Sequence, residues 1–175
     1  EELKENILKA VSENDVVLVN AGSSAGSEDY TSSIIRELGE VVVHGIAIKP
    51  GKPSILGIID KKPVLGIPGY PVSAFFVMEL FVKPLIDRLT RRQVKARKKI
   101  PATTARKIVS SLKHEEYVRV KLGNVDGKFI ATPLERGAGV IMSLVKADGF
   151  VTIPRNLEGY EAGDTVEVTL FKDFE

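Results

Sequence analysis

The spacing of apolar residues changes once along this chain of 175 residues, and that change constrains the fold more than any other feature. Before residue 91, short apolar runs alternate with segments whose apolar side chains recur every three or four residues, as on one face of a helix. Beyond residue 99, apolar and polar residues alternate, which is typical of half-buried strands. We therefore predict a layered α/β domain over residues 1–91 and a small all-β domain over residues 92–175.

The first half reads as helices and strands in alternation. The spacing predicts helices over residues 3–11, over 30–38 and from 72 onward, and strands over 16–19, 41–48, 54–59 and 64–67. The first of these strands is continuously apolar, as in a sheet that is mostly parallel and buried on both faces. We expect Pro84 to kink the last helix, because proline has no N–H to donate.

The second half carries strand and turn signals only. Val118–Leu122 and Val166–Leu170 alternate in polarity, and Asp126-Gly127 and Ala162-Gly163-Asp164 are typical turn sequences. Short strands joined by such turns indicate a small all-β unit.

A basic segment, Arg91–Lys99, lies at the predicted domain boundary. It holds no aromatic residue, whereas segments that bind single-stranded nucleic acid combine basic side chains with aromatic ones. We interpret it as a solvated linker and expect no nucleic-acid partner. Nucleic-acid binding is the alternative, and it predicts a DNA affinity that falls steeply with salt.

The chain contains no cysteine and two histidines, His44 and His114. Without cysteine there is no disulfide framework, no thiolate metal site and no cysteine nucleophile. The histidines fall in different halves, which disfavours a zinc site with several nitrogen ligands.

No stretch has the roughly 18 consecutive apolar residues of a membrane span and no signal pattern opens the chain, so we predict a cytoplasmic location. Since the chain begins at Glu1 rather than methionine, we expect it to be part of a longer protein.

The first candidate site is a loop of small residues that follows a predicted strand. Gly22, Ser23, Ser24 and Gly26 let backbone N–H groups and hydroxyls approach an anion near a helix N-terminus. Asp29, just after the loop, is placed for metal binding or acid/base chemistry. The alternative is a tight turn in which Asp29 only caps the next helix.

The second candidate is the loop Lys49-Pro50-Gly51-Lys52-Pro53. Its prolines stiffen a segment that carries two ammonium groups, which together can neutralise a doubly charged anion. The alternative is a pair of solvated surface lysines.

The third candidate is Pro68-Gly69-Tyr70-Pro71, a turn into a helix whose first N–H groups point towards the strand ends, with Ser73 in the first helical turn. It is alternatively a simple connection in which Ser73 satisfies the helix start. All three loops follow predicted strands, and ligands of open α/β sheets bind at strand ends.

In this order, the loops resemble the molybdopterin molybdenumtransferase (MoeA/gephyrin) family. The resemblance rests on residues 22–30, 47–53 and 68–74, and it continues through 116–120, 137–139 and 162–164. It implies a molybdopterin-binding domain followed by a β-barrel domain. The enzyme so described inserts molybdate, or tungstate, into adenylylated molybdopterin and releases AMP, in molybdenum cofactor biosynthesis.

The resemblance also implies a role for individual residues. Asp29 would serve Mg²⁺ and phosphate, and Lys49 and Lys52 would hold the oxyanion. The remaining implied cofactor-binding residues are Gly22, Ser23, Ser24, Gly26, Pro68, Gly69, Pro71 and Ser73, with Arg119 and Ser143 from the barrel domain. The implied partners are a second copy of the full-length protein, as a homodimer, and the molybdopterin adenylyltransferase of the pathway.

Three departures from the family pattern stand out. Ala21 replaces the first of two glycines, and Tyr70 replaces an asparagine. The family's first strand and its N-terminal domains are not in this sequence, so full activity is not expected from these residues alone. A non-catalytic scaffold that binds molybdopterin or a peptide is the alternative function. The related adenylyltransferase is a further one, expected to lack both the lysine-proline loop and the barrel.

Overall fold

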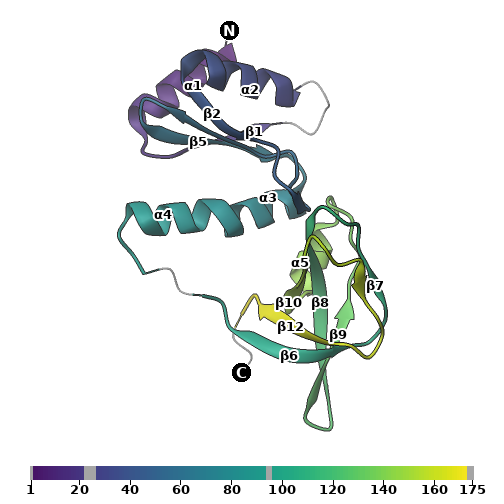
Figure 1. The fold of residues 1–175 in the computed structure, drawn as a ribbon. Helices are drawn as coiled ribbons and strands as arrows, with labels where there is room; N and C mark the ends of the chain where they lie inside the picture. Colours follow the sequence, from purple (N-terminus) through teal and green to yellow (C-terminus); the bar gives the residue numbers. More distant parts are fainter. Residues whose placement is uncertain (1, 22–26, 94–95, 173–175) are drawn as a thin grey trace. The chain divides into compact units, whose positions relative to one another are not determined.

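The computed structural model describes residues 2–21, 27–93 and 96–172. The chain divides into two compact units, one of Glu1–Ile46 with Gly51–Leu80 and one of Ala47–Pro50 with Phe81–Glu175. Figure 1 colours the first unit purple to teal and the second mainly teal to yellow. The predicted domain boundary between residues 91 and 92 stays a prediction.

The first unit contains a four-stranded sheet in the order β1-β5-β4-β2. Its strands are β1 (Val17–Ala21), β2 (Glu40–His44), β4 (Ile55–Ile59) and β5 (Lys62–Pro68). The predicted α/β class is confirmed, but the sheet is mixed rather than mostly parallel among the described residues. Only β1 and β5 pair in parallel, whereas β4 runs antiparallel to both of its neighbours. The cause is local: Asp60 and Lys61 have φ values of 49° and 61°, which make the two-residue turn of a β-hairpin.

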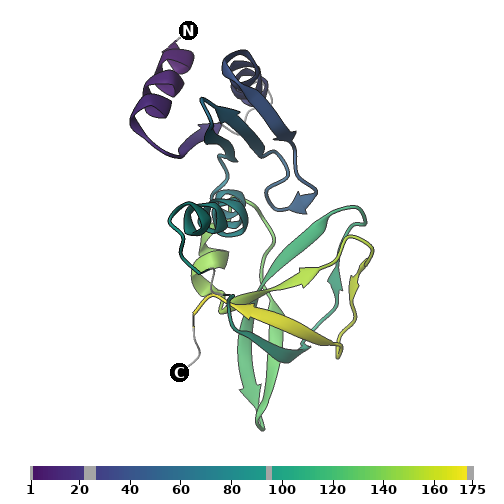
Figure 2. The ribbon, with the colours of Figure 1, turned by 60° about the vertical axis from the view of Figure 1, so that its left-hand side comes forward.

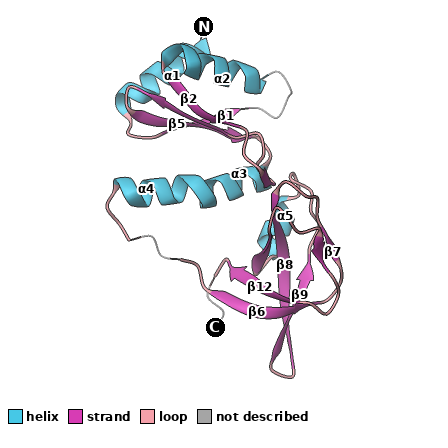
Figure 3. Cartoon of the chain, viewed as in Figure 1, coloured by secondary structure: helices cyan, strands magenta, loops and turns pink. Residues whose placement is uncertain are grey.

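Two helices, α1 (Glu2–Glu13) and α2 (Ser27–Leu38), cover one face of this sheet (Figure 3). Ile7 and Val11 of α1 lie four residues apart, hence on one side of the helix, and both are buried. They pack with Ile35 of α2 and with the inward side chains of the strands, Val17, Ile55, Ile59 and Val64. This cluster is the core of the first unit.

A third helical stretch follows β5 and consists of α3 (Pro71–Val77), the π-helical turn η1 (Met78–Val82) and α4 (Lys83–Leu89). The sequence predicts an irregularity at Pro84. The structure has the π-helical turn directly before Pro84, which lies in the first turn of α4. A changed hydrogen-bond pattern fits this place, because proline cannot donate to the carbonyl one turn earlier.

The second unit contains a closed ring of five strands, because β10 pairs with both β12 and β8 in the order β10-β12-β6-β9-β8 (Figure 2). These strands are β6 (Lys99–Thr104), β8 (Glu115–Val125), β9 (Lys128–Pro133), β10 (Gly149–Ile153) and β12 (Thr165–Leu170). Their inward residues form the core: Ala102, Val120, Leu122, Ala131, Val151, Val166, Val168 and Leu170. The predicted small barrel is confirmed, and Asp126-Gly127 forms the expected turn between β8 and β9.

Short elements complete the second unit. Strand β7 (Ile108–Val109) pairs with β11 (Gly159–Tyr160), and helix α5 spans Ile141–Lys146. Strand β3 (Ile48–Lys49) lies parallel to β8, with Lys49 opposite Glu116.

The predicted strand over residues 41–48 is therefore wrong at its C-terminal end. Strand β2 ends at His44, and Gly45 has a φ of 83°, a backbone conformation that favours glycine. The N–H of Gly45 donates to the carbonyl of Ser54 at 2.9 Å, which turns the chain away from the sheet. As a result Lys49 belongs to the second unit and Lys52 to the first.

Candidate anion-binding site

Several strand ends of the first unit meet at one edge of its sheet. The parallel register of β1 and β5 pairs Ala21 with Pro68, the last residue of each strand. The antiparallel registers pair Ile55 with Gly66 and with His44, so β4 begins where β2 and β5 end. The segments that follow β1, β2 and β5 and the segment that precedes β4 consequently share this edge.

The first predicted loop lies mostly outside the described residues, which is the case for Gly22, Ser23, Ser24 and Gly26. Its two ends are described: β1 ends at Ala21 and α2 begins at Ser27. Asp29 is the third residue of α2. The roles predicted for these residues stay predictions.

The third predicted loop is fully described and lies beside the end of β1. Pro68 is buried, Gly69 and Tyr70 are exposed, and Pro71 opens α3, where proline's missing N–H leaves no helical carbonyl unpaired. Tyr70 occupies the N-cap position without a side-chain hydrogen bond to the helix. Ser73 is buried. The Tyr70 side chain thus does not cap the helix, and its ring is exposed to solvent.

Lys52 lies at the same edge, in the turn before β4. Its carbonyl accepts a hydrogen bond from the N–H of Ile46 at 2.9 Å, and the Ser54 hydroxyl donates to the carbonyl of Gly51 at 2.7 Å. Ser54 is fully buried, so this turn is anchored from within while the Lys52 side chain is exposed. The structure therefore brings Lys52 to the same sheet edge as the turn at Gly69 and the two ends of the serine-glycine loop.

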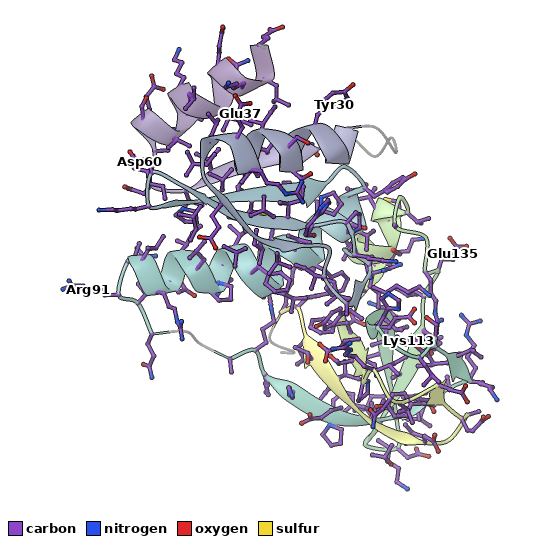
Figure 4. The ribbon with its side chains drawn as sticks, turned by 45° about the horizontal axis from the view of Figure 1, so that its top comes forward. Tyr30, Glu37, Asp60, Arg91, Lys113 and Glu135 are labelled. Atoms are coloured by element: carbon purple, nitrogen blue, oxygen red, sulfur yellow. The ribbon has the colours of Figure 1, made fainter. Side chains whose placement is uncertain are left out.

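Two exposed aromatic rings belong to the elements that begin at this edge. Tyr30 in α2 is 69% exposed, and Figure 4 shows it pointing away from the helix near the start of α2. Tyr70 is 51% exposed. Wherever exposure is described, the other aromatic side chains are buried or half-buried. Exposed aromatic faces suit contacts with flat ring systems.

The second unit has its own group of charged side chains, centred on Glu116 of β8. This carboxylate accepts a hydrogen bond from Ser110 Oγ at 2.6 Å, and its other oxygen lies 3.7 Å from Lys49 Nζ and 3.5 Å from Arg136 Nη1. Sequence reasoning missed Glu116 and Arg136. A signal was available: Glu116 is in phase with Val118, Val120 and Leu122, so its carboxylate occupies an inward position of the barrel strand.

Arg119 is a second buried charge on β8, only 2% exposed. Its Nη2 donates to the carbonyl of Glu135, a residue labelled in Figure 4, and lies 3.5 Å from that of Gly137. Burial lowers the pKa of the Arg119 guanidinium, the positive charge of Arg136 lowers it further, and Glu116 raises it. Its Nε is buried and has no hydrogen-bond partner among the described residues. Three cations, Lys49, Arg119 and Arg136, thus lie around the buried carboxylate of Glu116, and the exposed Glu135 precedes Arg136 in the chain. Positive charge is in excess, which favours an anionic ligand.

Ser143 lies in α5, is buried, and donates its hydroxyl to the carbonyl of Val140 at 2.6 Å.

A surface hollow in the same unit is lined by Leu112, Lys113, Arg155 and Asn156, none of which is a predicted site residue. Within the described ranges no group of three or more histidine and acidic side chains is placed to hold a metal ion. The same ranges contain no helix long and apolar enough to cross a membrane.

Comparison with known proteins assigns the two halves of the chain to two family models. Residues 1–88 match the model described as "Probable molybdopterin binding domain", and residues 101–171 match the "MoeA C-terminal region (domain IV)". The first match covers the α/β half and the second covers the barrel. The chain therefore belongs to the molybdopterin molybdenumtransferase (MoeA) family.

Individual relatives agree with this assignment. A Methanocaldococcus jannaschii protein whose name refers to molybdopterin biosynthesis is 42% identical over 98% of this chain and 40% of its own length. A Bacillus subtilis molybdopterin molybdenumtransferase is 27% identical over 95% of this chain and 39% of its own length. The crystal structure of a Pyrococcus horikoshii molybdopterin biosynthesis MoeA protein matches 99% of this chain and 41% of its own, with 44% identity and a TM-score of 0.79. The chain spans about 40% of the length of these relatives.

Proposed function

We propose that the complete protein inserts molybdate or tungstate into adenylylated molybdopterin and releases AMP, and that this chain supplies its molybdopterin-binding domain and its β-barrel domain. The observation that carries the proposal is the register at the sheet edge, where Ala21 lies opposite Pro68 and the turn that holds Lys52 precedes the neighbouring strand. The described part of this edge offers the exposed side chain of Lys52 and the exposed turn at Gly69, in a family named for molybdopterin.

The chemistry fits these groups. The substrates carry a pyrophosphate and a dianionic oxyanion, and the dithiolene sulfurs of the pterin supply the nucleophile, so the protein needs oriented charges more than a nucleophile of its own. In the proposal Lys52 and Lys49 hold the oxyanion. Gly22, Ser23, Ser24 and Gly26 meet the phosphate end, and Pro68, Gly69, Pro71 and Ser73 shape the pocket.

Asp29 is the residue we assign to Mg²⁺, which typically combines one or two carboxylates with substrate phosphates. When bound, the ion would neutralise charge on the leaving phosphate. Arg119 and Ser143 are assigned to substrate binding from the barrel domain. We further propose a cytoplasmic location, a homodimer of the complete protein and an encounter with the adenylyltransferase that makes the substrate.

The proposal is tested by incubating the complete protein with adenylylated molybdopterin, molybdate and Mg²⁺, and by following AMP release chromatographically. We expect release that depends on molybdate and is lost in Asp29→Ala, with an unchanged circular dichroism spectrum. Molybdopterin binding without AMP release would support the scaffold function instead. Full activity of Asp29→Ala would remove Asp29 from the site.

A further inference from the structure

Glu116 is a carboxylate in an unusual place, a buried position of a barrel strand. Only 3% of the residue is exposed, and it stands directly opposite Lys49 in the parallel pairing of β3 and β8. A buried carboxylate is costly unless charges and hydrogen bonds compensate it. The side chains around Glu116 therefore show which groups compensate its buried charge.

The two oxygens of this carboxylate have different surroundings. Oε2 accepts the hydroxyl of Ser110 at 2.6 Å, a full hydrogen bond that fixes the orientation of the group. Oε1 lies 3.7 Å from Lys49 Nζ and 3.5 Å from Arg136 Nη1. Ordinary N–H···O bonds are shorter, so Glu116 holds Lys49 by charge and does not occupy its N–H donors. The Lys49 side chain makes no other hydrogen bond or ion pair within the described residues.

The two cations that share Oε1 differ in freedom. Arg136 Nη1 also donates to the carbonyl of Val109, and Arg119 contacts the carbonyls on either side of residue 136. Arg136 is thereby fixed through its side chain and its backbone. The Lys49 side chain, in contrast, is 51% exposed and has Glu116 as its only ion-pair partner in the described structure. An anion that reaches this face meets an ammonium group whose place is set and whose three donors remain available.

We propose that Glu116 is a positioning residue, which fixes the Lys49 ammonium so that it can bind the oxyanion substrate. The proposal rests on the function given above, in which Lys49 contacts that oxyanion. Glu116 itself touches no substrate. Its negative charge alone would repel an anion, so a favourable effect of Glu116 on anion affinity must come from the geometry that it imposes.

This opposition of charge and geometry makes the proposal testable with molybdate alone as the probe. Affinity is measured by calorimetry for the complete protein and four variants. Glu116→Gln removes the charge, Glu116→Asp keeps it but withdraws the carboxylate by about one bond length, and Ser110→Ala frees its orientation. Glu135→Gln is the matched control, because it removes an exposed carboxylate next to the same group of cations.

We expect Glu116→Gln, Glu116→Asp and Ser110→Ala each to weaken molybdate binding by about three- to tenfold, and Glu135→Gln to leave it within about twofold. In turnover, the KM for molybdate should rise with kcat nearly unchanged. Thermal unfolding identifies any variant that fails to fold. If the Glu116 variants fail to fold, the molybdate affinity of Ser110→Ala, which keeps the charges of Glu116 and Lys49, tests the proposal.

Wild-type affinity in Glu116→Asp and Ser110→Ala would overturn the proposal, as would molybdate binding by Glu116→Gln that is as tight as in Glu135→Gln. A wild-type protein that binds no molybdate would also overturn it. If the wild type binds molybdate and the variants weaken it, but no AMP is released, the positioning role stands and the proposed reaction fails.

Discussion

Lys49 and Lys52 lie three residues apart in one loop, yet they are held in different ways. Lys52 belongs to the first unit, where the carbonyl of Gly51 and the backbone of Ile46 fix the turn and the ammonium group extends into solvent. Lys49 belongs to the second unit, where the buried Glu116 fixes the ammonium group itself. The comparison teaches that similar cations can be presented by backbone hydrogen bonds in one case and by a buried opposite charge in the other.

The comparison extends to the two units. At the described part of the sheet edge of the first unit, Lys52, Gly69 and Tyr70 are exposed, and the buried polar residues of this unit are uncharged. The barrel of the second unit buries two charged residues, Glu116 and Arg119, beside its apolar core. Substitutions at the edge should therefore change activity with little effect on stability, whereas substitutions at the buried charges should change both.

The largest expected effect is that of Lys52→Ala on turnover. Removal of a cation next to a developing or transferred negative charge should lower kcat/KM for AMP release by about 100-fold or more. Because the side chain is exposed, the free energy of unfolding should change by no more than about 0.5 kcal/mol. Steady-state kinetics and urea unfolding measure the two quantities. A variant with wild-type kinetics would show that Lys52 does not contribute to turnover.

Arg119→Ala should have the largest effect on stability. It removes a buried guanidinium that satisfies the carbonyl of Glu135, and it leaves a cavity between β8 and residues 135–137. We expect a loss of about 2–4 kcal/mol in the free energy of unfolding, measured by urea denaturation. Arg119→Lys, which keeps a charge but loses the planar fork, serves as the control and should recover only part of this loss. A change below 0.5 kcal/mol, the order expected of a surface residue, would contradict the contrast between the units.

Gly57→Ala tests the apolar packing of the first unit. A Cβ at this position would lie 2.4 Å from Ile35 Cγ2 and 2.9 Å from the carbonyl oxygen of Glu40, so α2 and the sheet would have to separate. We expect a loss of about 1–3 kcal/mol in the free energy of unfolding. Gly123→Ala, where the same construction meets no atom within 4 Å, is the matched control in the barrel. Equal effects of the two substitutions would be evidence against tight packing between α2 and the sheet.

The buried hydroxyl of Tyr117, in barrel strand β8, should make the stability of the protein depend on pH. Burial, the largest cause, and a hydrogen bond to Glu115 raise the pKa of the Tyr117 hydroxyl well above its ordinary value. A raised pKa in the folded state means that the contribution of this group is complete below the unfolded pKa of about 10 and falls as the pH rises beyond it. Thermal unfolding between pH 8 and pH 11 should show a steeper decline in wild type than in Tyr117→Phe. Parallel curves would argue against the buried hydroxyl.

Tyr70→Asn should have small effects on both stability and ligand binding. An asparagine at the N-cap of α3 accepts a backbone N–H that tyrosine leaves unpaired there, which should stabilise the protein by about 0.5–1 kcal/mol. If the exposed ring stacks on the pterin, the same substitution weakens molybdopterin binding by a few-fold. Differential scanning fluorimetry and calorimetry measure the two effects. Unchanged pterin affinity would exclude stacking by Tyr70.

The sequence was sufficient to predict the features that depend on local patterns. The α/β half, the all-β character of the second half and the hairpin turn at Asp126-Gly127 follow from periodicity and turn residues, whereas closure into a barrel was expected from the family resemblance. The break after His44 was missed, because Val41–Ile48 is apolar throughout except for His44 and Gly45 and a two-residue strand such as β3 is defined by its distant partner. Helix α5 was missed as well. Its apolar residues Ile141, Met142 and Val145 are exposed in the structure, so they do not mark a buried face from which a helix could be predicted.

The predicted site residues divide in the same way. The loops could be identified from small residues, prolines and lysines because those residue types restrict or free the backbone locally. Glu116 and Arg136 were not identified as a pair, since twenty residues separate them and the antiparallel pairing of β8 with β9 brings them together. Long-range ion pairs leave no trace in local spacing.

The most direct measurement of the central claim is an anaerobic titration of the isotope-labelled complete protein with molybdopterin, followed through backbone amide resonances. The account predicts that the largest shifts lie at the sheet edge of the first unit, in residues that follow Ala21 and Pro68 and in the turn Gly51–Ser54. Shifts confined to the hollow lined by Lys113 and Arg155, with none at this edge, would contradict it.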